Sequence, residues 1–218
     1  MPDLRISPRY GYEKYDSGLL GDLIDVFEDR LQNWLFEPAK ALLDFRNGDV
    51  ASLYLLIGYF EPHAIYRKGQ DSQGHSKAFF CDGFVEVFCK TGYSEPRIRS
   101  VAAALYEDVR CGLFHGGMLR ERIFLARARE AGQALWLTLP RVNGEIDKNG
   151  EIESMVIDVP AFSSEIEQHA AAYVKLLRDA KNTALRENFK KAVDLTWGVN
   201  ETGRSIGMSP EEWDRRFR

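Results

Sequence analysis

Apolar residues in the first half of the chain recur every three or four positions, which is the spacing of one face of an α-helix. The clearest series follows the capping pair Asp16-Ser17 and consists of Leu20, Ile24, Phe27, Leu31 and Trp34. Pro38 is expected to bend or restart this helix, and Asn47-Gly48 to end its continuation. Helices therefore dominate the predicted structure of this half.

Two further helices follow from start and stop signals. An apolar run at 50–57 predicts a helix with Asp49 as its cap and Glu61-Pro62 closing it. Because the run is apolar on nearly all sides, this helix should be central and largely buried. Ser94 to Pro96 then supplies a cap and a first-turn proline for a helix at about 96–116.

Residues 78–90 are ambiguous, because their phenylalanines and valines are good β-formers. Phe80, Phe84 and Phe88 are four positions apart, and the neighbouring segments are helical. A helix is therefore predicted here, with Thr91-Gly92 as its end.

From residue 121 the apolar pattern changes to short runs of β-forming residues. The runs at 123–128 (IFLARA), 134–139 (ALWLTL) and 154–159 (SMVIDV) are separated by the turn residues Gly132, Asn143-Gly144 and Asn149-Gly150. They predict a small antiparallel sheet of two or three strands within 121–159, which Pro160 closes.

Beyond the sheet, an apolar stripe predicts one long helix over 161–196, with Ser163-Ser164 and Glu167 as its capping residues. The stripe consists of Ile166, Ala170, Tyr173, Leu177, Ala180 and Ala184. The tail at 197–218 offers one short helix at most. The predicted fold class is mostly α: a single domain over 1–218, with a helical bundle core at 16–118 and a small sheet inserted before the long helix.

Composition narrows the class of protein. With 44% hydrophobic and 28% charged residues, the chain of 218 residues is typical of a soluble globular protein. No apolar run reaches the roughly 20 residues that a membrane-spanning helix needs. The first residues have no apolar segment of a secretory signal, so a cytoplasmic protein without a membrane partner is expected.

Metal and cofactor chemistry is not expected from the pattern of ligand residues. The three cysteines form no CxxC pair, and the four histidines, His63, His75, His115 and His169, are scattered. We therefore predict no structural metal and no cofactor. A net charge of −4 disfavours wrapping by nucleic acid but permits a local basic cleft.

The stretch YEDVRCGLFHGG, residues 106–117, carries the most distinctive residues of the chain. At about 100° per residue, the core-facing positions of its helix are Ile98, Val101, Ala102, Leu105, Val109, Gly112 and Leu113. Arg110 and His115 lie outside this stripe, on opposite flanks. The outer side is apolar at Ala103, Ala104, Cys111 and Phe114, which predicts cover by another helix or by a second subunit related by a two-fold axis.

An arginine and a histidine near a helix end suit a phosphodiester. Arg110 can hold a phosphate through its planar fork of donors, and His115 can transfer protons near neutral pH. Without a metal, the nucleophile would be the substrate's own 2′-hydroxyl, which confines the reaction to RNA. Arg120 and Arg122 follow directly and form either the positive wall of an RNA cleft or, the favoured alternative, a solvated strand edge.

The segment Arg110-Cys111-Gly112-Leu113-Phe114-His115 resembles the R-x4-6-H motif of the HEPN superfamily, late in a helix and followed by glycine. The resemblance implies a small α-helical bundle that dimerises through the motif helix, and a metal-independent ribonuclease in which Arg110 and His115 are catalytic. The position after the motif arginine is often Asn, Asp or His in that family, whereas here it is Cys111.

The sequence leaves both the function of the chain and the role of Arg110 and His115 open. The chain is either an RNA endonuclease or RNA-binding protein, or a catalytically inactive module that binds a nucleotide or a protein partner, which Cys111 and the acidic balance favour. At the level of single residues, Arg110 and His115 could instead be a helix-end pair that binds Glu107, Asp108 or a neighbouring helix.

Overall fold

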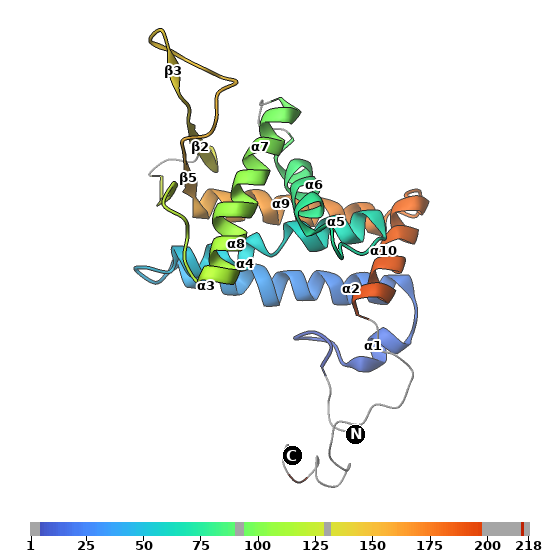
Figure 1. Cartoon of the computed structure of the whole chain (residues 1–218). Coiled ribbons are helices and arrows are strands. Elements are labelled where there is room, and N and C mark those ends of the chain that lie inside the picture. Colours follow the sequence, from blue (N-terminus) through green and yellow to red (C-terminus); the bar gives the residue numbers. More distant parts are fainter. Residues whose placement is uncertain (1–4, 90–93, 129–131, 198–214, 216–218) are drawn as a thin grey trace.

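The computed structural model describes residues 5–89, 94–128, 132–197 and 215. Figure 1 shows a mostly helical molecule in which a small sheet precedes α9 (Val159–Arg178) and α10 (Thr183–Thr196). The predicted fold class is therefore confirmed. No helix in the described part of the chain combines the length and the hydropathy that crossing a membrane requires.

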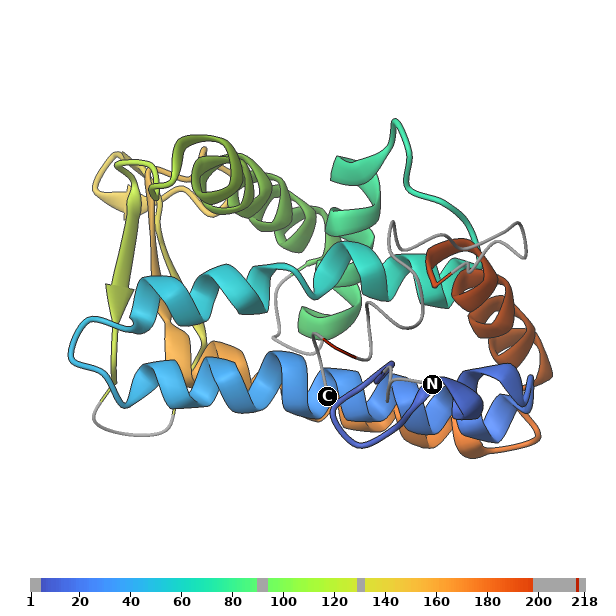
Figure 2. The same cartoon turned by 90° about the horizontal axis from the view of Figure 1, so that it is seen from below.

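Helix α1 (Tyr12–Asp16) leads into a long rod made of α2 (Leu20–Arg30), the π-helical segment η1 (Leu31–Phe36) and α3 (Glu37–Leu43), drawn in blue in Figure 2. A new helical segment begins at the expected place, because Pro38 lies in the first turn of α3, directly after the wider π turn of η1. The predicted apolar face is buried at Ile24 and Phe27. Trp34, however, is 51% exposed, since a π turn changes the rotation of the residues that follow.

Helices α4 (Asp49–Ile57) and α5 (Phe60–Lys68) follow one another alongside the rod (Figure 2). The prediction that Glu61-Pro62 ends the apolar helix is wrong, because both residues lie in the first turn of α5, where proline is well tolerated. Helix α4 buries one face and leaves Val50 and Tyr54 on the surface. The expected central position of this helix therefore holds for one face only.

The two remaining helices of this half confirm their predictions. Helix α6 (Ser76–Phe88) buries Phe80, Phe84 and Phe88, whereas the expected end at Thr91-Gly92 lies outside the described residues. The motif helix consists of α7 (Glu95–Leu105), the π-helical segment η2 (Tyr106–Arg110) and α8 (Cys111–Gly116). Every residue of its predicted core stripe is buried.

The sheet is mixed rather than antiparallel. Its order is β1 (Ile123–Ala126), β5 (Ser154–Asp158), β2 (Leu135–Thr138), and β1 runs parallel to β5 while β2 runs antiparallel to it. Strand β5 is central because β1 pairs with one of its edges and β2 with the other, and its side chains Met155 and Ile157 are fully buried. A separate hairpin joins β3 (Arg141–Val142) to β4 (Glu145–Ile146) through the predicted turn at Asn143-Gly144, where both residues have positive φ.

The predicted single helix over 161–196 is divided into α9 and α10. Asp158, not the serines at 163 and 164, caps α9 by accepting the Ala161 N–H at 3.0 Å, so Pro160 begins the helix instead of closing the sheet. Asp179 ends α9 in an extended conformation, and its carboxylate accepts the Lys181 N–H. Ala180 and Ala184 are consequently exposed. The short helix predicted in the tail falls on residues outside the described part, apart from Trp197 and Arg215.

The two largest of the three buried apolar clusters among the described residues hold most of these elements together. The larger cluster is formed by residues of the helices from α3 to α9 and of the sheet. At its centre, the ring of Phe60 is surrounded by Phe80, Phe84, Phe88 and Phe162. The smaller cluster joins α2, α9 and α10. Helix α6 crosses α5 at Gly83, and a Cβ atom at this position would collide with the carbonyl oxygen of Phe60. The close approach of α5 and α6 therefore depends on a glycine.

We expect Gly83→Ala to lower the free energy of unfolding by about 1–3 kcal/mol or more, because the added methyl group meets rigid backbone. Gly21→Ala in α2 is the matched control, since its Cβ would meet nothing within 4 Å. It should instead raise stability by about 0.5–1 kcal/mol. Urea unfolding of the two variants measures both values, and a stable Gly83→Ala protein would contradict the close crossing.

Candidate functional site

The motif helix ends in a sharp reversal that presents His115 and Arg110 on the surface. Gly117 has a φ of 71° and terminates α8. The chain then runs back along the helix, where the Met118 N–H donates to the Gly112 carbonyl at 3.2 Å and the Arg120 N–H donates to the Asp108 carbonyl at 3.1 Å. Gly112 is buried because this returning segment covers it.

Arg110 and His115 contact each other, although regular helical spacing places them on opposite flanks. Arg110 Nη1 lies 3.4 Å from His115 Nε2. The π-helical segment η2 ends at Arg110 and α8 is regular, so the contact is made by the reach of the long Arg110 side chain and not by a change of helical rotation. A guanidinium has only donors, so a hydrogen bond between the two groups uses His115 Nε2 as its acceptor.

Glu61 of α5 completes the polar part of the site. Its Oε2 lies 3.6 Å from Arg110 Nη2, and its Oε1 accepts the Ser72 hydroxyl at 2.8 Å. Arg110 thus pairs with a neighbouring helix, one of the partners expected for a structural helix-end pair. Sequence reasoning missed Glu61 because it assigned this residue to the end of a helix rather than to the first turn of α5.

Aromatic rings surround the guanidinium. Arg110 lies over the rings of Tyr106 and Phe114, at 5.4 Å and 5.2 Å from their centroids. Phe114 stacks on Tyr54 of α4, with 4.6 Å between the centroids. Phe114 is nevertheless 46% exposed and nearby Met118 is 74% exposed. The predicted apolar outer face is therefore covered only in part by this chain.

Arg120 and Arg122 do not form an open basic wall. Arg122 Nε donates to Oδ2 of the buried Asp108 at 2.5 Å, and Arg122 Nη1 donates to the Ile152 carbonyl at 3.2 Å. Arg120 Nη1 lies 3.9 Å from the other oxygen of Asp108. The charge of Asp108 thus offsets this pair, and Arg122 ties the motif helix to the segment that precedes β5.

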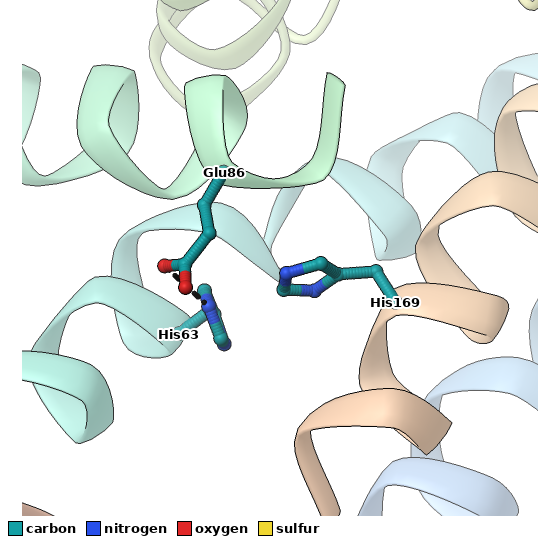
Figure 3. A group of neighbouring side chains, drawn as sticks. All are labelled: His63, Glu86 and His169. Carbon is teal, nitrogen blue, oxygen red and sulfur yellow. Dashed lines mark hydrogen bonds and ion pairs between the residues drawn. The ribbon is translucent and has the colours of Figure 1, made fainter. Parts of the chain in front are cut away.

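A second polar cluster brings together two histidines that are far apart in the sequence. His63 of α5, Glu86 of α6 and His169 of α9 meet beneath the surface (Figure 3). Burial opposes ionisation of Glu86, but the hydrogen bond from His63 and the charges of His63 and Arg67 outweigh it and lower the pKa of Glu86 to about 2. The sequence analysis missed this cluster, because no local spacing links its residues.

Comparison of the chain with protein-family models, with curated proteins and with solved structures yields no match. The resemblance of 110–115 to the HEPN motif therefore stays a prediction.

The hydrogen bond between the buried Asp108 and Arg122 should contribute to the stability of the fold. Asp108→Asn should lower the free energy of unfolding by about 1–3 kcal/mol, because a buried charge-assisted hydrogen bond is lost. Glu107→Gln is the matched control, since its exposed carboxylate pairs with Lys77 at 2.9 Å and contributes at most about 1 kcal/mol. Equal losses in urea unfolding would contradict a structural role for the Asp108–Arg122 pair.

Proposed function

We propose that the site around Arg110 and His115 binds RNA and cleaves it without a metal ion, as the HEPN resemblance implies. The observation that carries the proposal is the contact between the Arg110 guanidinium and His115 Nε2, beside an exposed aromatic stack. A cation for phosphate, a proton acceptor and a stacking surface are the three groups that such a reaction uses.

The reaction follows from these groups. The 2′-oxygen of the substrate forms a bond to phosphorus while the bond to the 5′-oxygen breaks, which leaves a 2′,3′-cyclic phosphate and a 5′-hydroxyl. His115 Nε2 accepts the proton of the 2′-hydroxyl and then returns a proton to the departing 5′-oxygen. Arg110 donates to the non-bridging oxygens, where negative charge develops. At 3.4 Å its contact with His115 is long, so a phosphate oxygen can displace it readily.

The exposed aromatic rings extend the site away from the phosphate. Tyr54 and Phe114 offer a flat surface on which a base of single-stranded RNA can stack. A second copy of the motif helix would pack beside this surface, at the exposed Met118, so a homodimer with two adjacent Arg110–His115 pairs is part of the proposal. We place this function in the cytoplasm, where RNA substrates are present.

A second candidate is a non-catalytic module that binds nucleotides or a protein partner through the same cleft. Two features favour it: Cys111 replaces the polar residue that often follows the motif arginine, and Glu61 already pairs with Arg110. Arg120 and Arg122 are the further candidates for RNA contact in either case, although Asp108 offsets their charge.

Cleavage depends on Arg110 and His115 if the proposal is correct. We expect Arg110→Ala and His115→Ala each to reduce cleavage of end-labelled RNA in excess chelator by at least about a hundredfold, because each removes one group of the mechanism. The wild-type products should carry cyclic-phosphate ends. Arg141→Ala on the β3–β4 hairpin and His75→Ala on the surface are matched controls and should keep wild-type activity.

The same assay decides between the two candidates. Circular dichroism in chelator first establishes that each variant is folded. If the wild type binds RNA without cleaving it, and Arg110→Ala does not bind it, the result would support the binding module. Equal cleavage by wild type and Arg110→Ala would show that the nuclease activity has another source and would sink the assignment of the site.

Glu61 should weaken RNA binding, because its carboxylate lies next to the phosphate position at Arg110. We expect Glu61→Gln to bind 2′-O-methyl RNA about two- to fivefold more tightly than wild type at low salt. This RNA resists cleavage because its nucleophile is blocked. Glu145→Gln on the exposed β4 strand is the control. Weaker binding by Glu61→Gln in fluorescence anisotropy would mean that Glu61 instead holds Arg110 in its binding position.

A further inference from the structure

Three side chains from three helices converge at the edge of the larger core. The ligand-type atoms of His63, Glu86 and His169 all lie within 4.8 Å of one another. His63 Nε2 and Glu86 Oε2 are 3.0 Å apart. The His63 side chain has no exposed surface, whereas one third of Glu86 is exposed, so the cluster is closed on the core side and reachable from the other. Figure 3 shows the ring of His169 pointing toward the other two residues.

A single hydroxyl orients both imidazoles. Tyr59 Oη lies 3.4 Å from His63 Nδ1 and 3.1 Å from His169 Nδ1. With both Nδ1 atoms held in this way, the Nε2 atoms are the ones that face the middle of the cluster. Histidines that bind metals are commonly held through the nitrogen that does not bind the ion, so this is the arrangement that a pair of ligands needs.

The carboxylate is also positioned by its neighbours. Arg67 Nε donates to Glu86 Oε1 at 2.8 Å, which leaves Oε2 directed toward His63. Glu86 can therefore offer one oxygen to an ion while the other stays hydrogen-bonded. Second contacts of this kind fix the geometry of carboxylate ligands.

A buried hydroxyl beside the cluster supports the presence of a further polar ligand. The ring of Tyr173 packs edge-on against His63, with 4.8 Å between the centroids. Tyr173 is 2% exposed, and its hydroxyl has no hydrogen-bond partner among the described residues. Folded proteins rarely leave such a group unpaired. A further polar ligand of the cluster, such as a water bound to an ion, would supply the missing partner.

We propose that His63, Glu86 and His169 bind one zinc ion, with water as the fourth ligand. Two imidazole nitrogens and one carboxylate oxygen are a donor set that tetrahedral zinc takes in proteins. Bonds of about 2.0–2.2 Å place the ligand atoms of a tetrahedron about 3.4 Å apart. The His63–Glu86 edge is already this short, and rotation of the His169 side chain closes the remaining distance. The ion would join α5, α6 and α9.

The simpler alternative is a hydrogen-bonded ion pair between His63 and Glu86. The two interpretations differ at His169, because an ion pair does not require this residue whereas the zinc site loses a ligand without it. The zinc site is also independent of the proposed ribonuclease, whose cleavage assay is run in excess chelator.

The experiment measures zinc binding by the full-length protein after treatment with chelator and dialysis. We expect the wild type to bind one Zn²⁺ per chain, measured by elemental analysis, and to be stabilised by Zn²⁺ in thermal unfolding. His169→Gln and His63→Gln should lose stoichiometric binding, and Tyr59→Phe should bind about 10–100-fold more weakly in competition with a colorimetric chelator. His75→Gln, an exposed histidine outside the cluster, is the control and should bind as the wild type does.

The outcomes separate the two interpretations. Far-UV circular dichroism shows which variants fold, and the partly exposed His169 carries the test if the buried His63→Gln variant does not fold. Loss of zinc in a folded His169→Gln protein supports the site. Wild-type protein that binds no zinc, or a folded His169→Gln protein that binds it as tightly as wild type, overturns the proposal.

Discussion

The contact between the backbone of Phe60 and Gly83 is the constraint on which the rest of the structure depends. It lets α6 approach α5 closely, and the ring of Phe60 then fills the space among Phe80, Phe84 and Phe162. Because helix axes separate when side chains lie between them, a larger residue at position 83 would move α6 away from α5. The aromatic core and both polar clusters include residues of α5, so all three depend on how α5 and α6 cross.

Helix α5 supports two different sites on two of its faces. Glu61 reaches Arg110 of the motif helix, while His63, two residues later, meets Glu86 of α6 and His169 of α9. Successive helical residues point about 100° apart, so neighbours in the sequence address different partners. A single well-packed helix therefore positions the Arg110 site and the His63 cluster together, which couples the geometry of each to the packing of the core.

Two π-helical segments interrupt long helices at informative places. Segment η1 precedes Pro38 and allows the rod from α2 to α3 to continue, and segment η2 ends at Arg110. Trp34 lies within η1, where the wider turn changes which side chains face outward, and it is exposed. Segment η2 lies directly before the Arg110–His115 contact, so its wider turn is part of the backbone that carries the candidate phosphate site.

The sequence by itself determined the helices at 20–30, 76–88 and 95–116, the three strand segments and the buried stripe of the motif helix, because each follows from local periodicity. It also singled out Arg110 and His115. Only the tertiary structure decided the parallel pairing of β1 with β5, the partner of Arg122 and the positions of Glu61 and His169. These depend on contacts between residues far apart in the chain, and no local pattern encodes which distant surfaces will meet.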